Sequence, residues 1–182
     1  MMSFLLSLDW MVVASKLLAF CTLLLLSKHS LKAMLLGKPS LCTQEQIDHS
    51  LFVLVSLGAL FHMLGRFVGD TILVADLGLV GKRQLYYFYF SLHELLLIVW
   101  VIQWHNIKRC EFANITKYIC YLSGVVLCLQ LLRYVDRVII EANYLEGVYR
   151  YGLASLNLVK ASVFLCYPLH LALRYLPNRK FA

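Results

Sequence analysis

Hydrophobic residues gather in five long runs along the chain, and short polar segments separate them. A helix needs about 20 mostly apolar residues to cross the hydrocarbon core of a membrane. Five stretches reach this length, at roughly residues 8–26, 51–69, 85–103, 118–140 and 148–171. The pattern predicts an all-α fold in which residues 1–182 form one bundle of transmembrane helices, a polytopic membrane protein with no soluble domain.

The second run is longer than one upright membrane helix needs. Its apolar character continues past Gly69 and Asp70 as far as Val80. Such a helix either tilts and projects from the membrane, or breaks and leaves its remainder in the interface. We expect a break near Gly69 and Asp70, with residues 70–80 as a separate helical, re-entrant or interfacial segment. Five spans, or four spans and an interfacial segment, are the two architectures that fit.

Composition agrees with a membrane protein. The chain is 61% hydrophobic and 15% charged, with a mean hydropathy of +0.74, whereas a soluble domain carries about 25% charged residues. This excludes an ordinary cytosolic globule, a disordered tail and a nucleic-acid-binding module, and it makes the lipid bilayer the first partner. The six cysteines form no C-x-x-C pair, so we expect no metal site and no cofactor.

The distribution of Lys and Arg in the loops predicts the orientation. One side holds nine of these residues, namely Lys28, Lys32, Lys38, Lys108, Arg109, Lys117, Arg174, Arg179 and Lys180. The other side holds three, namely Lys82, Arg83 and Arg150. Basic loops remain in the cytoplasm. We therefore expect a cytoplasmic C-terminus and an external N-terminus in a bacterial inner (plasma) membrane.

Ionisable residues inside membrane spans are costly, and they usually face the bundle interior or a water-filled cavity. In the predicted orientation most of these residues fall in the outer half of the membrane, and Lys160 lies near the midplane. The candidate residues for a charge network or an ion pathway are Glu94, Arg66, Asp70, Arg133, Asp136, Arg137, Glu141, His62, Lys160 and Asn157. Three glycines on the face of Arg66 are candidates for close helix packing, namely Gly58, Gly65 and Gly69.

Two interpretations of the charges remain open. In the first they form a structural network, in which Arg66 and Asp70 of the second span meet the charged residues of the fourth, Arg133, Asp136 and Arg137. In the second they line a hydrated cavity that binds an ion, a proton or a polar solute. Glu94 is the deepest acid, about nine residues or 13 Å below the start of its span. Its expected partner is a basic residue of another helix, namely Arg66, Arg133, Arg137 or Lys16.

Three classes of function are compatible with these features. A small component of ion, proton or polar-solute transport is favoured by the one-sided charge cluster. A non-catalytic subunit of a membrane complex or an immunity-type protein is favoured by the minimal loops, and its partner would be another copy of the chain or a different membrane protein. An intramembrane enzyme is third, because no catalytic motif is present and no catalytic residue can be assigned.

Overall fold

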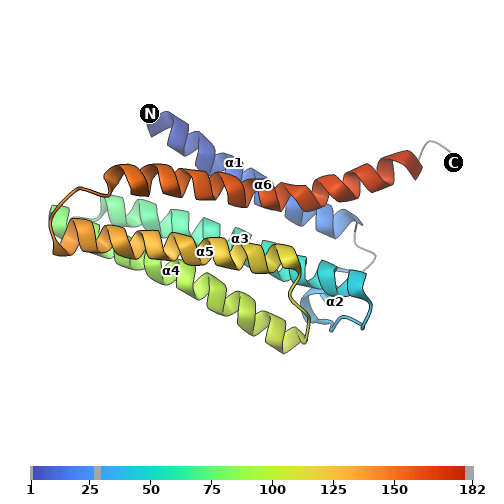
Figure 1. The fold of residues 1–182 in the computed structure, drawn as a ribbon. Coiled ribbons are helices and arrows are strands. Elements are labelled where there is room, and N and C mark those ends of the chain that lie inside the picture. The colour runs from blue at the N-terminus through green and yellow to red at the C-terminus, as the bar shows by residue number, and fades with distance from the viewer. Residues whose placement is uncertain (1, 27–29, 179–182) are drawn as a thin grey trace.

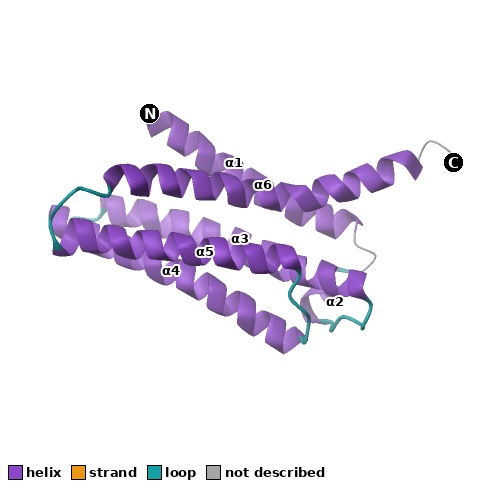
Figure 2. Cartoon of the chain, in the orientation of Figure 1, coloured by secondary structure: helices purple, strands orange, loops and turns teal. Residues whose placement is uncertain are grey.

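All regular structure in the part of the chain that the computed structural model describes, residues 2–26 and 30–178, is helical (Figures 1 and 2). The elements are α1 (Met2–Leu26), α2 (Leu31–Leu36), α3 (Thr43–Val74), α4 (Gly78–Lys108), α5 (Asn114–Tyr134), the π-helical turn η1 (Val135–Ile139) and α6 (Glu146–Asn178). The predicted all-α fold is confirmed.

Three helical segments are long and apolar enough to cross a membrane, namely Thr43–Val74, Gly78–Lys108 and Asn114–Ile139. The third combines α5 with η1. A shorter apolar segment, Trp10–Leu25, lies within α1. The described residues therefore contain three helices with the length and composition of membrane spans, compatible with an integral membrane protein.

The predicted break at Gly69 and Asp70 is wrong. Helix α3 continues through both residues to Val74, and the chain turns at residues 75–77. Helix α4 then begins at Gly78, whose φ of 65° is a left-handed conformation that favours glycine. Gly69 lies inside the helix. Its missing side chain makes room for the Phe90 ring of α4. Helix α4 thus starts seven residues earlier than the sequence pattern indicated.

The five long helices form a closed ring. Helix α1 packs against α3 and α6, α4 packs against α3 and α5, and α5 packs against α6. The ring has two ends, which we name by their connections (Figure 1). The turn end carries the α3–α4 and α5–α6 turns and the start of α1. The α2 end carries α2, residues 109–113 and the C-terminal part of α6.

The apolar core fills the ring toward the α2 end. Its buried members come from all five long helices and are Ala19, Leu23, Leu51, Val53, Leu54, Val55, Leu57, Phe61, Leu97, Val101, Ile119 and Phe164. Large apolar side chains are also exposed on the outside of the ring, among them Leu60, Phe67 and Trp100. Such an exterior is expected of helices that face lipid.

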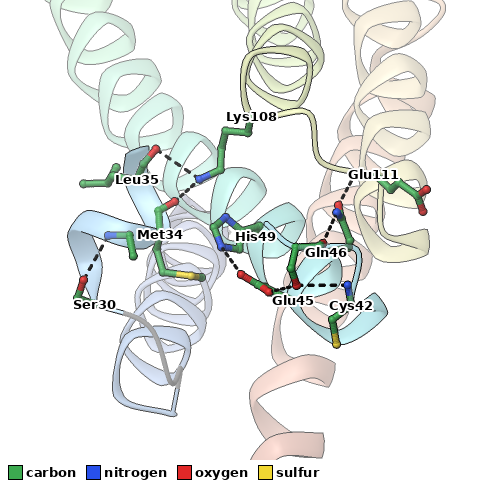
Figure 3. Close-up of polar contacts among 11 residues, drawn as sticks. Ser30, Met34, Leu35, Cys42, Glu45, Gln46, His49, Lys108 and Glu111 are labelled. Carbon is green, nitrogen blue, oxygen red and sulfur yellow. Dashed lines mark hydrogen bonds and ion pairs between the residues drawn. The ribbon is translucent and has the colours of Figure 1, made fainter. Parts of the chain in front are cut away.

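Polar contacts fasten the α2 end (Figure 3). The Lys108 ammonium donates hydrogen bonds to the carbonyl oxygens of Met34 and Leu35, at the end of α2. The Glu111 N–H donates to Gln46 Oε1 over 2.9 Å. These bonds attach α2 and the start of α3 to the segment that joins α4 to α5. The two bonds of Lys108 occupy backbone acceptors that the short helix α2 leaves open.

Candidate functional site

A partly buried ion pair joins α4 and α6 halfway along both helices. Lys160 Nζ lies 3.2 Å from Glu94 Oε2 and 3.3 Å from Oε1, and the two side chains are only 8% and 16% exposed. The expectation that Glu94 is paired with Arg66, Arg133, Arg137 or Lys16 is wrong. The early start of α4 places Glu94 deeper than its predicted span did, and so at the level of Lys160.

A second buried lysine meets α3 from α1. Lys16 Nζ donates to the Gly58 carbonyl oxygen over 3.1 Å, and it lies 3.3 Å from His62 Nδ1. The same ammonium is 5.6 Å from the centroid of the Phe164 ring of α6. Lys16 was recognised in the sequence as a charge within a span but was not assigned to the site. Its contacts place it in the middle of the ring.

His93 and two glycines set the contact between α3 and α4. His93 Nε2 donates to the Phe61 carbonyl oxygen over 2.7 Å, because a carbonyl can only accept. A side-chain carbon added at Gly65 would lie 3.0 Å from His93 Nε2, and one at Gly69 would lie 3.0 Å from the Phe90 ring. The two glycines therefore let rings of α4 rest directly on α3.

Two neighbouring cavities connect these groups to the turn end. The outer cavity has a volume of about 300 Å³ and extends from Leu73 and Tyr86 to the middle of the ring. The inner cavity has a volume of about 50 Å³ and is lined by all five long helices. Four lining residues are shared, namely His62, His93, Glu94 and Asn157. The two cavities therefore adjoin each other beside the Lys160–Glu94 pair.

The outer cavity carries both signs of charge. Arg66 lines it, and its guanidinium lies 4.4 Å from the Trp10 ring centroid, a cation–π contact between α3 and α1. Asp70 also lines it, is exposed, and has no hydrogen bond or ion pair with any residue that the structure describes. The mouth of the cavity thus presents a carboxylate that is available to solvent.

The inner cavity ends on the apolar core. Leu54, Leu97, Ile119 and Phe164 belong to that core and also line the cavity. The inner cavity is therefore bounded on the side of the α2 end by a layer of apolar side chains.

The charged residues of the fourth predicted span form a separate cluster. Arg133 donates to Asp136 and to Asn143 over 2.6 Å each, and the Asp136 carboxylate accepts the backbone N–H groups of Tyr144 and Leu145. Arg137 donates to the Ala142 carbonyl oxygen, and Glu141 is exposed with a φ of 56°. These bonds close the α5–α6 turn. The network interpretation expected Arg133, Asp136 and Arg137 to meet Arg66 and Asp70. The bonds that close the turn do not link the two sets.

A buried polar node near the α2 end was missed in the sequence. Ser50 Oγ lies 2.8 Å from His105 Nε2 and 2.8 Å from Thr116 Oγ1, and it accepts the Ala113 N–H over 2.9 Å. His105 Nδ1 donates to the Val101 carbonyl oxygen. Ser50 is 0% exposed, and its oxygen already has three partners. The Ser50–His105 pair is therefore a structural joint of three helices and no accessible nucleophile.

Comparisons with known proteins give no further assignment. No family model, no curated protein and no solved structure matches the chain. Within the described residues, no group of three or more His, Cys, Asp or Glu side chains is placed to hold a metal ion.

Proposed function

We propose that this chain is a five-span protein of the bacterial inner membrane that provides a gated pathway for a small ion, a proton or a small polar solute. The observation that carries the proposal is the two adjoining cavities inside the closed ring, which extend from the turn end to the Lys160–Glu94 pair. In the proposed orientation the turn end faces outward, because its loops hold the smaller number of basic residues.

The position of the ion pair favours transport over a purely structural role. Taking two charges out of water is costly, and apolar residues of similar volume often stabilise a protein as well as a buried ion pair does. A charged pair at the middle of membrane helices, beside a cavity that continues to one end, is the arrangement expected for an ion or substrate pathway. Glu94 lines both cavities, so its carboxylate lies where the outer cavity adjoins the inner one.

The apolar layer supplies the gate in this proposal. A hydrophobic constriction excludes water and ions until it widens. Leu54, Leu97, Ile119 and Phe164 form such a layer directly beyond the inner cavity. In this proposal the conformation is open outward and closed inward.

Flux into liposomes tests the proposal. The purified chain is reconstituted into vesicles, and passage of H⁺, K⁺ and Cl⁻ is followed separately with a dye or an electrode for each ion. We expect flux of at least one ion above that of protein-free vesicles. The flux should be lost in Glu94→Gln, because glutamine keeps the shape of the side chain but cannot ionise. Glu111→Gln is the matched control, since Glu111 is exposed and lies outside both cavities.

Two results would contradict the proposed pathway. The first is an absence of flux for all three ions from protein shown to be folded in the vesicles, which would overturn a pathway for protons and for these ions. The second is equal flux in wild type and Glu94→Gln. An effect of Glu111→Gln as large as that of Glu94→Gln would also count against a specific role of the buried carboxylate.

A further inference from the structure

The size of the inner cavity limits what it holds. Its volume is about 50 Å³, and a water molecule takes about 30 Å³ of liquid volume. The cavity therefore has room for one or two particles of the size of water or of a monovalent ion. An organic solute does not fit in it, whereas the outer cavity is several times larger.

Two side chains that line this small cavity have hydrogen-bond donors that no described acceptor uses. Ser123 of α5 lines it and is 1% exposed, and its hydroxyl has no hydrogen bond with any described residue. The Lys160 ammonium has three N–H donors, and its described bonds are the two to Glu94. Buried polar groups are almost always hydrogen-bonded, so these donors indicate a bound acceptor.

The charge of the lining selects the kind of acceptor. Among the described residues that line the inner cavity, two are lysines, Lys16 and Lys160, and one is a carboxylate, Glu94. The two remaining titratable groups, His62 and His93, are neutral or positive. A cation would be repelled by this lining, whereas one negative charge would balance it.

We propose that the inner cavity binds one monovalent anion of halide size, with the two lysines supplying the positive charge and the Ser123 hydroxyl donating a hydrogen bond. The inference deepens the proposed function, because it names the class of ion. It rests on that function only for the passage of the anion through the membrane. Binding itself needs only the cavity that the five helices form.

Thermal unfolding of the detergent-solubilised protein tests the site without any flux. Melting temperatures are measured in increasing sodium bromide, with sodium gluconate at the same ionic strength as the reference. A ligand that binds only the folded state raises the melting temperature with its concentration. We expect bromide to raise it in wild type. Ser123→Ala should weaken the apparent affinity about tenfold or more, because the lost hydrogen bond is made to a charged group.

Ser91→Ala is the matched control. Ser91 is also a buried serine, at 5% exposed, but its hydroxyl donates to the Tyr87 carbonyl oxygen and does not line the cavity. Its variant should show the bromide effect of wild type. Equal melting temperatures of wild type in bromide and gluconate would overturn the anion site and leave a water molecule as the partner of Ser123. A bromide effect that is unchanged in Ser123→Ala would place the anion elsewhere and overturn this site.

The two proposals fail separately. Bromide binding without flux in liposomes would support the anion site and contradict the pathway. Flux of protons or potassium without bromide binding would support the pathway and overturn the anion site.

Discussion

Lys160 Nζ lies 3.2 Å from Glu94 Oε2, and this contact joins α6 to α4 at the middle of both helices. Each residue stands alone on its own helix, without an opposite charge one turn away in sequence. Only the packing of the ring brings them together. The pair therefore depends on how α4 and α6 are arranged, and mutation of the pair tests that arrangement.

Substitutions at Lys160 and Glu94 should have strongly non-additive effects on the stability of the protein. Lys160→Met strands the Glu94 carboxylate, and breaking a buried ion pair in this way costs about 3–5 kcal/mol. The double variant Lys160→Met/Glu94→Gln removes both charges and should regain most of that loss. A double-mutant cycle of melting temperatures in detergent checks this. Purely additive effects of the two substitutions would show that the side chains do not interact.

The glycines of α3 offer a second test of the packing. Gly65→Ala should destabilise the protein by about 1–3 kcal/mol, because the added carbon would lie 3.0 Å from His93 Nε2 and would displace the ring from the Phe61 carbonyl. Gly124→Ala is the control on α5, where a side-chain carbon would meet no atom within 4 Å. That variant should be neutral or up to about 1 kcal/mol more stable. Equal effects in the two variants would contradict the close contact of α3 with His93.

Cysteine labelling should report both the topology and the burial of the α2 end. Cys42 is exposed before α3, whereas Cys110 is buried in the segment after α4. Burial raises the pKa of the Cys110 thiol above its usual value. Only the thiolate reacts with maleimides. At neutral pH a variant that keeps only Cys110 should therefore label much more slowly than one that keeps only Cys42, and its rate should rise as the pH is raised toward that pKa.

Cysteine labelling also tests the proposed orientation of the chain in the membrane. A membrane-impermeant maleimide should label Cys42 in inside-out vesicles and not in intact spheroplasts. Gly147→Cys, made in a cysteine-free chain, supplies the opposite side, because Gly147 is exposed near the α5–α6 turn and has open space around it. It should label in spheroplasts. The reverse pattern for the two positions would overturn the orientation.

The periodicity of apolar residues predicts much of this structure. It does not predict which residues of neighbouring helices lie at the same level. The all-α fold and the interior placement of Glu94, His62 and Lys160 follow from apolar runs whose polar residues share one helix face. The pairing of Glu94 does not follow, since it depends on where α4 begins. Helix α4 begins at Gly78 after a short local turn at residues 75–77, and the apolar residues on both sides of the turn conceal it.

The polar node of Ser50, His105 and Thr116 was hidden for a different reason. Each of these residues lies near one end of its helix, where polar residues commonly mark the end of an apolar span. Only the meeting of three helix ends makes them 0–1% exposed. Likewise, a single sequence does not reveal that Ser123 lacks a partner, because this depends on what the four other helices bring to its side.

The node has a mechanical consequence for the ring. Ser50, His105 and Thr116 join α3, α4 and α5 into one block, whereas α1 and α6 pack on each other and none of their described side chains is hydrogen-bonded to these three residues. If the apolar layer is the proposed gate, we expect it to widen by movement of the α1–α6 pair relative to that block. At mid-height the pair is latched to the block by Lys16 on Gly58 and by Lys160 on Glu94. The proposed anion would contact both ammonium groups, so its binding would change how firmly the α1–α6 pair is held to the block.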